Sequence, residues 1–205
     1  MELFIQYIIS SVVQIILFTL LPFIWWLITA RKKSSFFEWI GLKKIGNAKE
    51  NKTFLYVIGT AIAFMVLAVF MFRISSTLET ATSGFKGLGL AAVPAVLVYA
   101  IFNTALPEEI IFRGFLLKRL SNKFGFGVGN FIQSLIFGLM HGVMFFSVTG
   151  TLKALIITLF TGAIGWVMGY VNEKKAEGSI IPSWMIHAMA NIFSGLCAAF
   201  LIFGA

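Results

Sequence analysis

LFIQYIISSVVQIILFTLLPFIWWLITA, residues 3–30, is a long apolar run without a single charged side chain. A helix needs about 20 predominantly apolar residues to cross the hydrocarbon core of a bilayer, and the apolar part of a signal peptide is much shorter than this run. Further uncharged stretches lie at residues 53–72, 87–107, 125–151, 154–172 and 178–205. We therefore predict an all-α fold, a polytopic membrane bundle of about six transmembrane helices.

Composition supports a membrane protein and argues against a nucleic-acid-binding one. The mean hydropathy is +0.95 and only 12% of the residues are charged, which lies outside the usual range of soluble proteins. The net charge is +8, but the Lys and Arg residues lie in short loops beside the apolar runs and not along one soluble face. Cys197 is the only cysteine, which excludes an intrachain disulfide and a cysteine-based metal cluster.

The distribution of basic residues predicts how the chain crosses the membrane. If the loop at residues 31–52 is cytoplasmic, only Arg73, Lys86 and Lys153 of the 16 Lys and Arg residues fall outside. The positive-inside rule then places both termini outside. We expect a multi-pass protein of the plasma membrane, most naturally that of a bacterium, organised as an N-terminal two-helix segment at residues 1–86 and a second part at residues 87–205.

Pro107 interrupts the third apolar run, which continues into the sequence PEEIIFRGFLL at residues 107–117. One continuous helix over residues 87–117 would be about 46 Å long at 1.5 Å per residue, longer than the hydrocarbon core. Proline lacks a backbone donor and its ring crowds the preceding turn, so we expect a kinked or broken helix at Pro107. Glu108 and Glu109 would then begin a new helical segment.

These two glutamates have different expected roles. Glu109 and Arg113 are four residues apart with the acid first, which is the favoured order for an ion pair on one helix face. That pair neutralises itself and is expected to be structural. Glu108 points in another direction and has no local counter-charge, which suits a group that accepts or donates a proton.

The only two histidines of the chain, His141 and His187, both fall inside predicted spans. Phe137 lies four residues before His141, and Asn191 lies four residues after His187, so each pair shares a helix face. Taken singly, each polar residue could join two helices by a hydrogen bond, and Phe137 could simply pack. Ionisable groups at membrane depth usually mark a functional site, and one acid, two histidines and an amide from three spans favour such a site here.

Three segments carry a resemblance to a known family. EEIIFR (108–113), FGLMH (137–141) and HAMAN (187–191) resemble the EExxxR, FxxxH and HxxxN motifs of the CPBP family, the CAAX-protease and bacteriocin-processing (Abi) intramembrane proteases. The resemblance extends over about residues 87–203, and the first two spans carry no motif. It implies that residues 87–205 are a protease core that hydrolyses a peptide bond of a membrane-associated protein or peptide.

The resemblance also implies roles for the individual residues. Glu108 and His141 would activate a water molecule, and His187 and Asn191 would stabilise the tetrahedral oxyanion. Glu109, Arg113 and Phe137 would support these groups. The chemistry agrees with the residue types, because amide hydrolysis needs a base for water and donors directed at the developing negative charge.

A zinc ion is an alternative source of the activated water. Glu108, His141 and His187 match the number of protein ligands in a zinc hydrolase, whose fourth position holds water. The two histidines are far apart in the sequence, however, and not paired in an H-E-x-x-H motif on one helix. Related prenyl-protein endopeptidases are thought to use glutamate without a metal, so we favour a reaction without a cofactor.

Two other functions are compatible with the same polar residues. Glu108 and the histidines could form the proton path of a coupled transporter, although the chain shows no corresponding inverted halves. The protein could also bind a peptide without cleaving it, as an immunity protein would. For an enzyme, candidate substrates include prenylated proteins, peptide pheromones, bacteriocin leaders and small membrane proteins.

Overall fold

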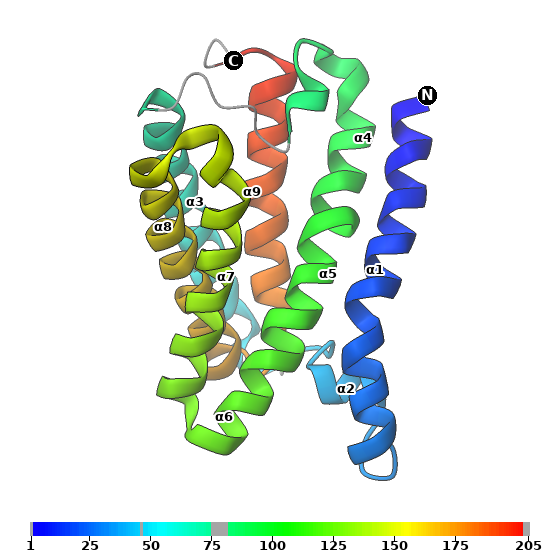
Figure 1. The fold of residues 1–205 in the computed structure, drawn as a ribbon. Coiled ribbons are helices and arrows are strands. Elements are labelled where there is room, and N and C mark those ends of the chain that lie inside the picture. Colours follow the sequence, from blue (N-terminus) through cyan, green and yellow to red (C-terminus); the bar gives the residue numbers. More distant parts are fainter. Residues whose placement is uncertain (1, 46, 75–81, 203–205) are drawn as a thin grey trace.

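The computed structural model describes residues 2–45, 47–74 and 82–202, and within these residues the chain is helical and contains no strand (Figure 1). The predicted all-α fold is therefore confirmed. In chain order, the elements are α1 (Glu2–Thr29), α2 (Phe36–Ile40), α3 (Asn47–Ile74), η1 (Ser83–Phe85), η2 (Gly89–Ala92), α4 (Val93–Val98), η3 (Tyr99–Ala105), α5 (Leu106–Glu109), η4 (Ile110–Leu117), α6 (Lys118–Phe124), α7 (Phe126–Thr149), α8 (Thr151–Tyr170), η5 (Val171–Lys175) and α9 (Ile181–Ala199).

Long apolar helices make this an integral membrane protein. Among the described residues, four helical stretches are long and apolar enough to cross a bilayer, namely Glu2–Thr29, Gly89–Phe124, Phe126–Thr149 and Thr151–Lys175. The other two predicted spans coincide with α3, which contributes a shorter apolar stretch at Lys52–Val66, and with α9. Large apolar side chains such as Ile9 and Ile28 are exposed, as expected of a surface that faces lipid.

The helix around Pro107 changes its hydrogen-bonding pattern but does not break. Residues Gly89–Phe124 follow one continuous helical path, drawn in green in Figure 1. π-Helical turns lie on both sides of α5, at Tyr99–Ala105 and Ile110–Leu117. The wider π turn before Pro107 accommodates the missing donor of the proline, and such turns are frequent at functional sites.

The α7–α8 hairpin forms one side of the bundle, and its two helices approach each other through small residues. Gly138 of α7 lies against the backbone of Thr158 and Gly162 of α8, where any side chain would collide. On the other sides, α1 packs against α4, η3 and α5, and α3 packs against α9. The long green helix thereby lies between α1 and α7, and it packs against α9 (Figure 1).

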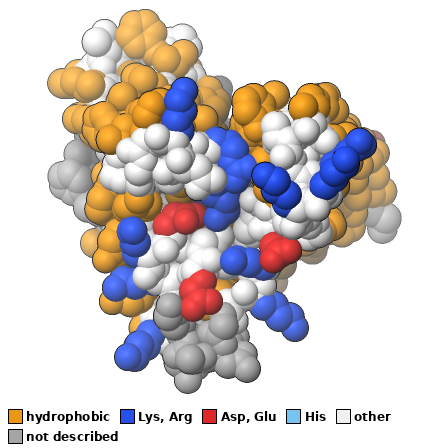
Figure 2. Space-filling model, turned by 90° about the horizontal axis from the view of Figure 1, so that it is seen from below, with side chains coloured by type: hydrophobic (Ala, Val, Ile, Leu, Met, Phe, Trp, Pro, Cys, Tyr) orange, Lys and Arg blue, Asp and Glu red, His pale blue; other side chains and the backbone are white. Residues whose placement is uncertain are grey.

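Basic side chains gather at one end of the bundle. The turn after α1, together with α2 and α6, lies at the lower end in Figure 1, opposite the start of α1 and the end of α9. Figure 2 shows many Lys and Arg side chains on this end, among a few acidic ones. Lys118 helps to join the elements at this end of the bundle, because the Lys118 Nζ donates to Glu173 Oε1 at 2.9 Å and to the Gly178 carbonyl at 2.7 Å. This end is the one that the charge distribution assigns to the cytoplasm.

Candidate functional site

The structure brings Glu109 of α5 and His187 of α9 into direct contact. His187 Nδ1 lies 3.0 Å from Glu109 Oε1, although the two residues are 78 positions apart in the chain. The same oxygen accepts a hydrogen bond of 2.7 Å from Arg113 Nη1, so the predicted ion pair between Glu109 and Arg113 is present. Glu109 therefore joins the structural pair to one of the two histidines, a link that helical spacing alone does not reveal.

Arg113 is enclosed by protein. Its side chain and that of Glu109 are both 0% exposed. The guanidinium carbon lies 4.3 Å from the centre of the Phe137 ring, and Nη2 lies 3.8 Å from Met168 Sδ. A buried cation is stable only beside a compensating charge. Arg113 therefore needs the Glu109 carboxylate to stay charged, and the guanidinium in turn holds that carboxylate in position.

Glu108 occupies a different environment from Glu109. Its side chain is 18% exposed, and Oε2 lies 3.9 Å from His187 Nε2. Within the described residues, this buried oxygen has no hydrogen-bond partner. Arg113 of the same helix pairs with Glu109, whereas Glu108 Oε2 faces His187 on α9.

The imidazole nitrogen that the structure places in ion-pair range of Glu108 is His187 Nε2, at 3.9 Å, whereas the sequence suggested His141 as the first partner. His141 is turned toward its own helix, with Nδ1 2.9 Å from the Phe137 carbonyl oxygen. A carbonyl only accepts, so Nδ1 carries the proton, and Nε2 of the neutral ring is an acceptor. In the described structure, no hydrogen bond or ion pair joins His141 to Glu108.

Phe137 connects the two histidines. Its ring centre lies 4.5 Å from that of His141 and 6.0 Å from that of His187, which it meets edge to face. Phe112 packs against the same ring at 5.0 Å. Because Arg113 lies over this ring as well, Phe137 contacts groups from three helices. Its supporting role in catalysis stays a prediction.

Asn191 has a partner that sequence reasoning missed. Its Nδ2 donates a hydrogen bond of 2.7 Å to Thr104 Oγ1 in η3. The available signal was spacing, because Thr104 precedes Glu108 by four residues and shares its helix face. A threonine in an apolar helix is common, however, and only the tertiary contact singles this one out.

A second missed feature anchors the first turn of α9. Asn172 Nδ2 donates to Ser183 Oγ at 2.7 Å, and Ser183 N donates to Asn172 Oδ1 at 3.1 Å. Both residues are fully buried. Ser183 precedes His187 by one helical turn, so this pair of bonds fixes the part of α9 that carries His187.

Glu108, His141 and His187 are not grouped as a three-ligand metal site in the described part of the chain. Over the described residues, no group of three or more His, Cys, Asp or Glu side chains is placed to hold a metal ion. A catalytic zinc needs three protein ligands around one point, and because His141 Nδ1 and His187 Nδ1 bind a carbonyl and a carboxylate, only the two Nε2 atoms remain as ligands from these rings. We therefore derive no step through a metal.

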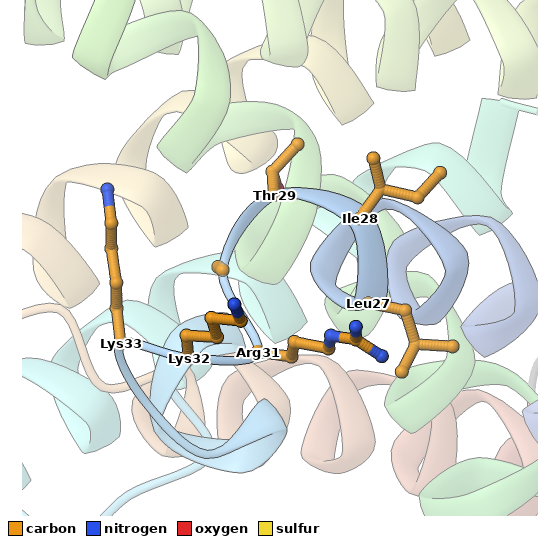
Figure 3. A pocket seen from close by; sticks show the side chains of 7 residues that line it. Leu27, Ile28, Thr29, Arg31, Lys32 and Lys33 are labelled. Carbon is orange, nitrogen blue, oxygen red and sulfur yellow. The ribbon is translucent and has the colours of Figure 1, made fainter.

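A surface pocket of about 600 Å³ lies away from these residues, at the end of α1 (Figure 3). It is lined by residues 27–33, including the three basic side chains Arg31, Lys32 and Lys33. None of the candidate site residues contributes to it. This pocket belongs to the basic end of the bundle and is separate from the Glu108–His187 site.

Comparison with known proteins agrees with the motifs. Residues 89–193 match the model of the type II CAAX prenyl endopeptidase Rce1-like family, and this region contains all seven predicted site residues. No curated protein and no solved structure gives a significant match. The family match covers more than half of the chain. The chain therefore belongs to the Rce1-like family of type II CAAX prenyl endopeptidases.

Proposed function

We propose that this membrane protein is an intramembrane endopeptidase in which Glu108 and His141 activate a water molecule for attack on a peptide carbonyl. The observation that supports the proposal best is the contact between α5 and α9, where His187 lies between the two motif glutamates. Its Nδ1 is 3.0 Å from Glu109, and its Nε2 is 3.9 Å from Glu108. Two motifs far apart in the sequence thus meet at one place, and Phe137 of the third motif lies 6.0 Å from His187, measured between ring centres.

Two proton acceptors are available for the water. Glu108 Oε2 has no hydrogen-bond partner among the described groups, and His141 Nε2 is an acceptor because Nδ1 holds the ring proton. A base within hydrogen-bonding reach of a water contributes roughly 10²- to 10⁴-fold to the rate. The proton removed from water passes to the leaving amine nitrogen as the C–N bond breaks, which completes the hydrolysis.

His187 and Asn191 are the donors for the oxyanion. His187 Nδ1–H donates to the carboxylate of Glu109, and that negative charge stabilises the ring when Nε2 is protonated as well. A protonated Nε2 can donate to the developing negative charge. Asn191 supplies an amide N–H on the next turn of the same face of α9. Preorganised donors of this kind are usually the largest single contribution to catalysis of acyl transfer.

The substrate is a membrane-associated protein or peptide. Glu108 and His141 lie on helices that are long and apolar enough to cross a membrane, so a scissile bond must reach them from the bilayer or its surface. Prenylated proteins, bacteriocin leaders and peptide pheromones are the candidate classes. Comparison of peptides in cells that carry wild-type or Glu108→Gln protein would identify the substrate, because the uncleaved precursor accumulates only with the variant.

Cleavage of a reporter peptide by purified protein in nanodiscs tests the proposal. Glu108→Gln and His141→Ala should each lower the rate by roughly 10²- to 10⁴-fold while the protein stays folded. Glu38→Gln is the matched control, because Glu38 is exposed on α2 at the basic end, outside the site, and should cleave like wild type. Full activity of Glu108→Gln would exclude Glu108 as the base. Glu108-dependent proton flux without cleavage would indicate a transporter instead.

A further inference from the structure

Thr104 and Asn191 form a hydrogen bond between the helix that carries Glu108 and the helix that carries His187. Asn191 Nδ2 lies 2.7 Å from Thr104 Oγ1, and the two residues are 87 positions apart. The Thr104 hydroxyl is also 3.2 Å from the Tyr99 carbonyl oxygen and 3.4 Å from that of Ala100. The hydroxyl therefore has three polar neighbours and one proton.

The chemistry of these neighbours determines which way the Asn191 amide faces. Both carbonyls only accept hydrogen bonds, so the Thr104 proton is donated to one of them. The Thr104 oxygen is then an acceptor, and the group of Asn191 that faces it must be the NH₂. The amide oxygen in that position would meet another acceptor unless the Thr104 proton left both carbonyls. Thr104 thus selects one of the two possible orientations of the amide.

An amide nitrogen carries two protons, and Thr104 uses only one of them. The second N–H of Asn191 is therefore free to donate to another group. In the flipped orientation, an oxygen lone pair would take the place of this N–H and would repel an oxyanion there. The orientation with the NH₂ on Thr104 therefore directs an N–H to this position while it keeps the interhelical bond.

The local backbone explains why the Thr104 hydroxyl is held in place to accept the hydrogen bond from Asn191. Thr104 lies in the π-helical turn Tyr99–Ala105, directly before Pro107. Threonine hydroxyls bond to carbonyls one turn earlier in a helix. Here these carbonyls include the one of Tyr99, five residues back, because a π turn is wider than an α turn. The irregular turn thereby fixes the hydroxyl one helical turn before Glu108.

We infer that Thr104 is a positioning residue, which orients Asn191 so that one amide proton is available for the oxyanion. The inference rests on the proposed endopeptidase function. It assigns to a residue outside the three motifs a share in the reaction, exerted through Asn191 and not by contact with the substrate.

The test is a double-mutant cycle of Thr104→Val and Asn191→Ala, with Thr104→Ser as the conservative variant. Removal of an oxyanion donor costs roughly 10²- to 10³-fold in kcat, so a misdirected Asn191 should cost about 10-fold or more. Thr104→Val should lower kcat with little change in KM, and Thr104→Ser should restore it. In the Asn191→Ala background, Thr104→Val should have no further effect on kcat.

Thermal unfolding of the same proteins separates positioning from folding. If Thr104→Val does not fold, Thr104→Ala removes the same hydroxyl with less steric demand and replaces it in the cycle. Equal losses of kcat from Thr104→Val with and without Asn191 would overturn the inference, and so would wild-type kcat in Thr104→Val. In both cases, Glu108-dependent cleavage by wild-type protein would leave the proposed function intact. Absence of that cleavage would instead overturn the function itself.

Discussion

His187 Nδ1 and Glu109 Oε1 form a hydrogen bond of 3.0 Å between α9 and α5. Because the same carboxylate oxygen also binds Arg113 at 2.7 Å, one fully buried charge serves two partners. Arg113 keeps Glu109 ionised and fixed, and Glu109 in turn fixes the ring of His187. Removing Glu109 should therefore affect both folding and catalysis, for reasons that can be separated by experiment.

We predict that Glu109→Gln destabilises the protein and abolishes cleavage. The substitution leaves the guanidinium of Arg113 buried without its counter-charge, which typically costs about 3–5 kcal/mol. It also removes the carboxylate that supports a protonated His187. Unfolding in detergent and cleavage of a reporter peptide measure the two effects on one protein sample.

A second variant separates the effect on stability from the effect on cleavage. Glu109→Gln/Arg113→Met removes both charges and replaces the arginine by an unbranched, shorter apolar side chain. Stability should return toward the wild-type value, because replacement of a buried ion pair by apolar groups is often neutral. Cleavage should stay low, because His187 still lacks its carboxylate. Recovery of both properties would show that the His187–Glu109 bond has no catalytic role.

Gly165→Ala on α8, next to Phe137 and Arg113, should reduce activity. An added Cβ would lie 3.1 Å from Phe137 Cδ1 and 3.2 Å from Arg113 Nη2, so both groups must shift. Extra volume in a packed core costs about 1–3 kcal/mol, and a small displacement of positioned groups can lower a rate by up to about 10²-fold. Gly127→Ala on α7 is the control, because nothing lies within 4 Å of its added Cβ. Equal activity of the two variants would contradict the prediction.

Treatment with a chelator should leave cleavage unchanged. The proposed base is formed by Glu108 and His141, and the described residues do not bring three metal ligands together. Purified protein is dialysed against a chelator and assayed with and without added zinc. Loss of cleavage that zinc restores would show a metal-dependent reaction and would assign Glu108, His141 and His187 a new role as ligands.

The orientation in the membrane can be measured with introduced cysteines. Cys197 is buried, and Cys197→Ala provides a background without thiols. Lys33 at the basic end and Lys86 before η2 are both exposed, and Figure 1 places the segments that carry them at opposite ends. In intact cells, an impermeant maleimide should label Lys86→Cys and should label Lys33→Cys only after lysis, as the positive-inside rule requires. The reverse pattern would place the termini in the cytoplasm.

The sequence was sufficient for the features that depend on one helix at a time. Uncharged runs such as residues 3–30 require helices in a bilayer, because an unpaired backbone polar group is too costly in hydrocarbon. Spacing of four residues predicted the ion pair between Glu109 and Arg113, which the structure contains. The motif residues were also identified from the chain alone, and they all lie within the matched family region.

Tertiary structure decided the features that depend on how two helices meet. Spacing along a helix does not specify its rotation or depth against a neighbour, which follow from packing at positions such as Gly138 and Gly165. Only that packing places His187 beside Glu109 and Asn191 beside Thr104, and only local backbone contact turns His141 toward Phe137. The chain by itself determined which groups are available for chemistry, whereas the packing of the helices determined which of them face one another.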